Sequence, residues 1–134
     1  MSESMQAQPL IAVRDVRASS RFYQQVLGAK SGHGGEEYEQ IVREGVMLLQ
    51  LHHRDAHAHS HLIDERVAVG NGVLLWFLAP DFDAAVARVR AAGATVLEEP
   101  HVNPNARHRE CMFLDPDGYK VVFASRYGDL GTTR

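Results

Sequence analysis

A pattern of apolar and polar positions occurs twice along the chain, once in each half. The apolar run LIAV at 10–13 precedes a segment with one apolar helical face, and the run VLLWFLA at 73–79 precedes another. The apolar positions of the first segment are Phe22, Tyr23, Val26 and Leu27. Those of the second segment, at i, i+3, i+4 and i+7, are Phe82, Ala85, Val86 and Val89. Each half therefore begins with a predicted strand and a predicted amphipathic helix.

Both predicted helices are flanked by residues that suit helix ends. Asp15 and Asp81 stand directly before the helical segments, where an aspartate oxygen can accept a hydrogen bond from a free backbone N–H of the first turn. Gly28 and Gly93 follow the last apolar positions, and glycine readily takes the left-handed conformation that ends many helices. We therefore expect one helix between Asp15 and Gly28 and another between Asp81 and Gly93.

Short strands are predicted after each helix. They lie at about 29–33, 37–43 and 46–52 in the first half, and at about 94–99, 109–114 and 119–125 in the second. The sequence DPDG at 115–118 indicates a tight turn between the last two strands, because proline presets φ and glycine accepts positive φ. Each half thus has the order βαβββ, and the fold class is α+β.

The two βαβββ modules form one predicted domain at 8–125. Its predicted parts are module 1 at 8–52, a linker at 53–71 and module 2 at 72–125, with flexible termini at 1–7 and 126–134. A connection as long as this linker, without secondary structure of its own, is uncommon in compact domains. We therefore expect the linker to be a lid or a disordered link.

The composition is that of a soluble globular protein, and it argues against several functions. Of the 134 residues, 45% are hydrophobic and 23% are charged, and the formal net charge is −3 without any basic stripe, which argues against nucleic-acid binding. The single Cys111 leaves no disulfide framework. The start MSESMQAQP lacks the apolar segment of a signal peptide, and no apolar run approaches the roughly 20 residues that span a membrane. We therefore expect a cytoplasmic protein that does not act on membranes.

Histidines crowd into the stretch HHRDAHAHSH at 52–61. Imidazole is the commonest protein ligand for transition metals, and His57, His59 and His61 would point to one side of an extended backbone. Together with His52 they are candidate ligands for a divalent metal such as Zn, Ni, Fe or Mn. The alternative, which we favour, is a solvated linker, because a flexible chain must lose entropy before it binds an ion.

The segments VRDVRASSRFYQQVLGA at 13–29 and DPDGYKVVF at 115–123 resemble the vicinal oxygen chelate superfamily of glyoxalases, bleomycin-resistance proteins and extradiol dioxygenases. The resemblance covers residues 8–125. It implies that each βαβββ module curls a mixed sheet around a concave pocket. It also implies a homodimer.

Metal-dependent members of this superfamily take four ligands from the first and last strands of the two modules. The resemblance places these ligands at Gln8, Gln50, Leu74 and Val122. Leucine and valine cannot bind a metal ion, and an open metal site needs about three protein ligands. The usual metal site of the superfamily, and the reaction that depends on it, are therefore expected to be absent.

Four residues on predicted strands are candidates to contact a small ligand. Gln50 and His52 share one face of a strand by the period of two. Tyr38 and Trp76 are aromatic residues with a polar group, and we expect Trp76, rather than its neighbour Phe77, to face the pocket. A structural role is the alternative for each of them.

The polar segment PHVNPNARHRE at 100–110 is expected to be a loop that carries binding groups. The candidate ligand-binding residues in it are His101, Asn103, Asn105 and Arg109. Arg109 suits an anion, because a guanidinium group can bind it through two hydrogen bonds. His108 and Glu110 are candidates for a general acid–base pair. The alternative is an ordinary turn rich in Asn and Pro.

The sequence favours a small-molecule-binding protein of the glyoxalase/bleomycin-resistance type that needs no cofactor. Its ligand would be a small organic molecule, partly aromatic or polar, bound between the sheets. The alternative is a metal-dependent lyase, isomerase or dioxygenase with displaced ligands, for which we consider Gln50, His52, His101 and Glu110. A third possibility is a metal-handling protein that uses the histidine-rich linker.

Overall fold

The computed structural model of the chain describes residues 4–55 and 62–129. Its elements are β1 (Leu10–Val13), α1 (Val16–Leu27), β2 (Lys30–Gly34), β3 (Tyr38–Arg43), β4 (Val46–His53), β5 (Leu75–Leu78), α2 (Phe82–Ala91), β6 (Val96–Asn103), β7 (His108–Leu114) and β8 (Lys120–Ala124). The candidate metal ligands His57, His59 and His61, and the ends of both termini, lie outside the described residues. No helix among the described residues is long and apolar enough to cross a membrane.

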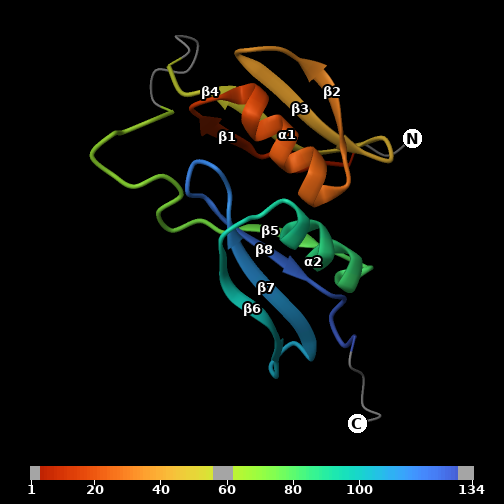
Figure 1. Cartoon of the computed structure of the whole chain (residues 1–134). Coiled ribbons are helices and arrows are strands. Elements are labelled where there is room, and N and C mark those ends of the chain that lie inside the picture. The colour runs from red at the N-terminus through yellow and green to blue at the C-terminus, as the bar shows by residue number, and fades with distance from the viewer. Residues whose placement is uncertain (1–3, 56–61, 130–134) are drawn as a thin grey trace.

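The strands form two four-stranded sheets with the same topology (Figure 1). The strand order is β1-β4-β3-β2 in the first sheet and β5-β8-β7-β6 in the second. In each sheet the first strand pairs in parallel with the last strand of its module, and the other pairs are antiparallel. The α+β fold of two βαβββ modules with mixed sheets is therefore confirmed.

The predicted helix ends are confirmed as well. Asp15 accepts a hydrogen bond from the backbone N–H of Ala18 at 3.0 Å, and Asp81 accepts one from Ala84 at 3.2 Å. Gly28 ends α1 in the left-handed conformation, with φ of 62°. These caps satisfy backbone groups that have no partner within the helix, and they fix where each helix meets the strand before it.

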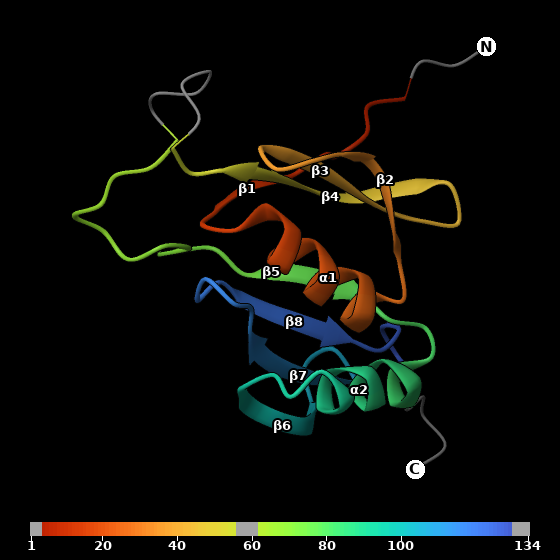
Figure 2. The ribbon, with the colours of Figure 1, turned by 45° about the horizontal axis from the view of Figure 1, so that its top comes forward.

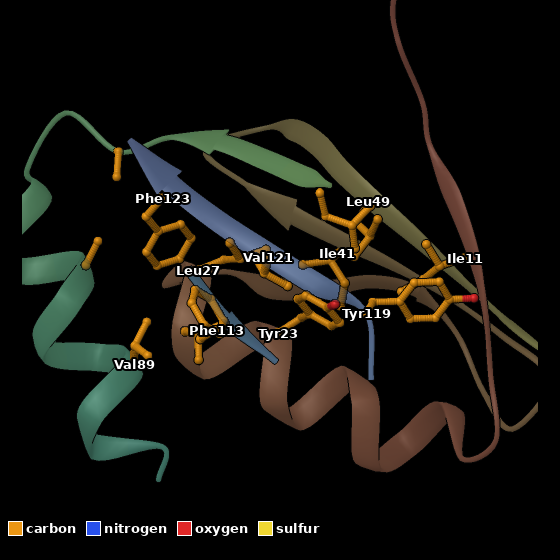
Figure 3. Close-up of a cluster of buried hydrophobic side chains, with 14 of the residues drawn as sticks. Ile11, Tyr23, Leu27, Ile41, Leu49, Val89, Phe113, Tyr119, Val121 and Phe123 are labelled. Carbon is orange, nitrogen blue, oxygen red and sulfur yellow. The ribbon is translucent and has the colours of Figure 1, made fainter. Parts of the chain in front are cut away.

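The two modules share one hydrophobic core (Figure 3). α1 lies between the first sheet and the strands of the second module (Figures 1 and 2). Its residue Tyr23 is fully buried, and its Phe22 ring lies 6.2 Å from Phe113 of β7, which in turn lies 5.1 Å from Phe123 of β8. Each sheet therefore has an inner face that is turned to the helices and an outer face that is turned away from them.

Hydrogen bonds also join the modules. The Tyr23 hydroxyl donates to the carboxylate of Asp115 at 2.6 Å, and the Tyr119 hydroxyl donates to the backbone carbonyl of Ala12 at 2.9 Å. Asp115 is only 5% exposed, and it also accepts from the backbone N–H groups of Asp117 and Tyr119 at 2.9 and 2.8 Å. The DPDG turn therefore does more than connect β7 to β8, because its first residue links the second module to α1.

The expectation that residues 100–110 form a loop is wrong. β6 extends to Asn103 and β7 begins at His108, so only a short turn separates them. β6 is an edge strand, where proline is tolerated because no partner strand needs its missing N–H, and this explains how Pro100 fits within it. As a result His101, Asn103, His108 and Glu110 project from paired strands.

Candidate functional site

The first group of polar side chains lies on the outer face of the first sheet. Tyr38 and Gln40 on β3 alternate with Glu39, which points to α1 and accepts a hydrogen bond from Ser20 at 2.6 Å. The Tyr38 hydroxyl donates to the side-chain oxygen of Gln50 on β4 at 2.5 Å, and the Gln40 amide donates to the Tyr38 oxygen at 3.1 Å. The Gln50 amide then donates to the backbone carbonyl of Gln8 at 2.9 Å. Together these bonds fix the orientation of the Tyr38 ring.

His52 stands beside this group on the same face of β4. It pairs in register with Tyr38 of β3 and with Ala12 of β1, and its ring lies 6.4 Å from the Tyr38 ring. His52 is 8% exposed, and its Nδ1 lies 3.0 Å from the backbone oxygen of His53. The structure therefore brings Tyr38, Gln50 and His52 together, although His52 presents little of its surface to solvent.

The second group lies on the outer face of the second sheet. The Nε2 atom of His108 lies 2.5 Å from the Oε2 atom of Glu110, and the Asn103 amide donates to the same oxygen at 2.8 Å. Asn103 is opposite His108 in the β6–β7 register, and His101 is opposite Glu110. The side chains of His108 and Glu110 are only 10% and 13% exposed. They form a charge-assisted pair in a setting with little water.

The protonation of Glu110 follows from these contacts. Burial alone raises the pKa of the Glu110 carboxyl, but the hydrogen bonds from Asn103 and His108, with the charges of His108 and His101, outweigh burial and place the pKa below its ordinary value. Glu110 is therefore ionised at neutral pH. It is a hydrogen-bond acceptor that holds the His108 ring and the Asn103 amide in place.

Trp76 adds an open aromatic surface to the second group. Its ring lies 6.2 Å from the His108 ring, and the residue is 48% exposed. Its neighbour Phe77 points the other way, to the inner face, where its ring lies 6.3 Å from that of Phe123. An exposed indole beside a rigid His–Glu pair can stack on a ligand ring while the polar groups stay in place.

Two of the candidate residues are not part of either group. Arg109 alternates with His108 and Glu110 and so lies on the inner face, where its guanidinium stacks on Phe82 at 4.8 Å and pairs with Asp83 and Asp129. Asn105 lies in the β6–β7 turn, where its backbone N–H donates to the Asn103 side chain at 3.0 Å. The anion-binding role expected of Arg109 gains no support, because protein carboxylates already occupy its guanidinium group.

The sequence model of the glyoxalase/bleomycin resistance protein/dioxygenase superfamily matches residues 6–123. The chain belongs to this superfamily. A superfamily enzyme from Burkholderia phytofirmans is similar in structure, with a TM-score of 0.72 and 23% identity over 88% of this chain and 95% of that one. TioX from Micromonospora aligns with a TM-score of 0.73 and 15% identity, over 92% and 99%.

A third similar structure, a protein of unknown function from Agrobacterium tumefaciens, aligns with a TM-score of 0.74 and 22% identity over 93% of this chain and 96% of that one. No curated protein matches the sequence. At these identities the structures show the superfamily fold alone, and the chemistry of this member must be read from its own residues.

The residues at the superfamily's expected metal positions do not fit a metal ion. Val122 is an aliphatic side chain, 2% exposed, on β8, and Leu74 is another, just before β5. The Gln50 oxygen already accepts a hydrogen bond from Tyr38. No three His, Cys, Asp or Glu side chains within 4–55 and 62–129 are placed to share a metal. The displaced set Gln50, His52, His101 and Glu110 is divided between the two sheets.

Sequence reasoning missed one member of the first group, Gln40. Its amide donates a hydrogen bond to the same Tyr38 oxygen that bonds to Gln50, its partner in the β3–β4 register. The signal was present in the sequence, because Tyr38 and Gln40 are two apart on a predicted strand and must share a face. Only the strand pairing shows that this face also carries Gln50.

Replacement of Glu110 by Gln is expected to lower the free energy of unfolding by about 1–2 kcal/mol at neutral pH, because it weakens two hydrogen bonds that a carboxylate accepts. The loss should shrink as the pH falls. A carboxyl whose folded-state pKa is lowered stabilises the fold above its unfolded pKa and loses this contribution as the pH falls through the folded pKa. Urea unfolding of both proteins across the acidic range measures the difference.

The matched control for this change is Glu36→Gln, because the Glu36 side chain is 82% exposed and lies 3.9 Å from Arg17. It should have almost no effect at any pH, as exposed ion pairs contribute little. A difference between Glu110→Gln and the wild type that does not change with pH would contradict the assigned ionisation of Glu110.

Proposed function

We propose that the protein binds a small organic molecule reversibly, without a metal ion, on the outer faces of its sheets. The exposed Trp76 ring beside the buried His108–Glu110 pair carries this proposal. The ring supplies apolar contact area, and because the first group lies on the other sheet, we propose that the first group of a second copy supplies further donors and acceptors. The poor fit of the superfamily's metal positions supports binding rather than the metal-dependent reactions of its relatives.

We also propose that two copies of the chain associate and that the second copy closes the ligand site. β5 is an edge strand, and apolar residues on it and just before it are exposed: Val73 by 53%, Leu74 by 45% and Trp76 by 48%. An edge strand with exposed apolar side chains is a surface that proteins usually cover. The free thiol of the buried Cys111 agrees with our proposal of a cytoplasmic location.

Because Trp76 is the only tryptophan, its fluorescence reports on the proposed site directly. Protein that has been treated with EDTA is titrated with a panel of aromatic compounds that carry hydroxyl or amide groups. We expect at least one compound to change the Trp76 emission, and calorimetry should give the same affinity with and without EDTA. Tyr38→Phe should weaken binding by about five- to tenfold, because it removes a hydroxyl group. Glu110→Gln should weaken it by a similar factor, because it loosens the His108 and Asn103 side chains that the Glu110 carboxylate holds in place.

Tyr127→Phe is the matched control for Tyr38→Phe, because Tyr127 is 78% exposed and lies beyond β8. It should leave the affinity unchanged. Sedimentation of the same samples should give roughly twice the chain mass of 14.9 kDa. Binding that disappears with EDTA would contradict the metal-free site. A panel without any binder would contradict the small-molecule ligand. A monomer that binds with full affinity would contradict the role of the second copy.

A further inference from the structure

A cavity of about 260 Å³ lies where the two modules meet, away from the polar groups of the candidate site. Its walls come from both modules. The larger apolar lining residues are Leu27, Val46, Leu48, Phe77, Leu78 and Phe123. Ligand pockets usually begin at about 300 Å³, so this cavity suits a compact molecule with an apolar part.

Two arginines, one from each module, also line this cavity. Arg88 of α2 reaches across to the first module, where its Nε atom donates to the backbone carbonyl of Val26 at 3.0 Å. Arg43 stands at the end of β3. Among the described residues, neither guanidinium has a hydrogen bond from its Nη atoms to the protein. Their terminal N–H groups therefore remain available to a bound acceptor.

The acidic groups nearby do not balance these two charges. Glu44 also lines the cavity, but its carboxylate is 3.9 Å from the Nε atom of Arg43, and its side chain is 86% exposed. An exposed pair at this distance contributes little. Burial lowers the pKa of Arg88, and the positive charge of Arg43 lowers it further, while Asp81 opposes the change. An anion between the two arginines would relieve this repulsion.

Arg88 also has a structural role at the end of α1, but this role does not explain its free Nη atoms or the nearby Arg43. Its hydrogen bond to Val26 and its position against Gly28 place it at the carboxyl end of α1, where a cation is favourable. This contact uses only the Nε atom. Arg43 has no such contact and lies on the β3–β4 hairpin, so the cap at α1 does not account for a second cation at the same cavity.

We propose that this cavity between the modules binds a small organic anion, a carboxylate joined to a compact apolar group. Arg43 and Arg88 hold the carboxylate, and the side chains of Leu48 and Phe77 contact the apolar group. Guanidinium groups suit carboxylates, because planar donors and planar acceptors form paired hydrogen bonds. This site is separate from the proposed site at Trp76 and does not depend on it.

Benzoate is the test ligand, and benzamide is its neutral counterpart of nearly the same shape. Because an aromatic amide is also a candidate ligand for the site at Trp76, the two compounds are compared in the Trp76→Ala variant as well as in the wild type. In that variant, calorimetry or ligand-observed NMR in phosphate-free buffer should detect benzoate binding, with benzamide at least tenfold weaker. Arg43→Gln and Arg88→Gln should each weaken benzoate about tenfold, since each removes a charged donor. Arg21→Gln, on an exposed position of α1, is the matched control and should have no effect. Equal binding of benzamide and benzoate in Trp76→Ala would overturn the proposal.

Further variants keep the test decisive if Arg88→Gln folds poorly. Val46→Phe fills the cavity from the exposed hairpin and leaves both arginines in place, so it should also abolish benzoate binding. Trp76→Ala should leave it unchanged. Loss of benzoate binding in Trp76→Ala, but not in Arg43→Gln, would place the anion at the other site and overturn the proposal. If inorganic phosphate binds as tightly as benzoate, the proposed contact of the ligand's apolar group with Leu48 and Phe77 is overturned.

Discussion

Phe113→Ala is expected to lower the free energy of unfolding by about 3–5 kcal/mol, as is typical for the truncation of a buried phenylalanine. Phe113 is fully buried, and its ring contacts Phe22 from α1 and Phe123 from β8. The cavity left by this change would therefore open in the core that both modules share (Figure 3). Urea unfolding, followed by circular dichroism and by Trp76 fluorescence, measures the loss.

The two probes should still report a single transition in this variant, since one core stabilises both modules. Val102→Ala on β6 is the control, because Val102 is 51% exposed and its truncation should cost little. Separate transitions for the helical signal and for Trp76 would mean that the modules unfold independently, which contradicts the shared core.

Asp115→Ala is expected to cost about 3 kcal/mol or more. The Asp115 carboxylate accepts hydrogen bonds from the Tyr23 hydroxyl and from two backbone N–H groups, and the substitution leaves all three donors without this partner. Tyr23→Phe, which removes a single hydroxyl, should cost only about 1 kcal/mol. Urea unfolding at neutral pH compares them. A loss for Asp115→Ala no larger than that for Tyr23→Phe would mean that the backbone contacts of Asp115 contribute nothing.

Asp115→Asn separates the charge of this residue from its hydrogen bonds. Burial raises the pKa of Asp115 from its ordinary value of 3.8, although the hydrogen bonds from Tyr23, Tyr119 and Asp117 oppose the change. A carboxyl with a raised folded-state pKa stabilises the fold fully below its unfolded pKa, and this contribution is lost as the pH rises through the folded pKa. The stability of the wild type relative to Asp115→Asn should therefore fall with rising pH across that range.

The fold was predictable because its signals are local and occur twice. Asp15 and Asp81 mark the starts of the two helices by a contact three residues away, and such a contact is determined by the sequence itself. The repeated strand–helix–strand order then leaves few possible arrangements of the sheets. The same local reasoning explains why the segment 100–110 was misread, since its polar and turn-forming residues say nothing about the edge-strand pairing that orders them.

The candidate site was only partly predictable, because it depends on pairing between distant residues. The period of two placed Gln50 and His52 on one face, and the structure confirms that placement. Arg109 shows the limit of this reasoning. Its partners Asp83 and Asp129 lie 26 and 20 residues away in the sequence. No short-range pattern reveals that these two carboxylates bind the Arg109 guanidinium group.

The shared core has a consequence for how such a chain can originate by duplication. A protein made of the first βαβββ unit alone would have no Asp115 to accept the hydrogen bond of Tyr23, and one made of the second unit alone would have no Ala12 carbonyl to accept the hydrogen bond of Tyr119. A single unit could bury such groups by packing against another copy of itself. Fusion of two copies in tandem turns such an assembly, which depends on concentration, into a folding step within one molecule. Each half is then free to diverge, as the different polar groups on the two sheets have done.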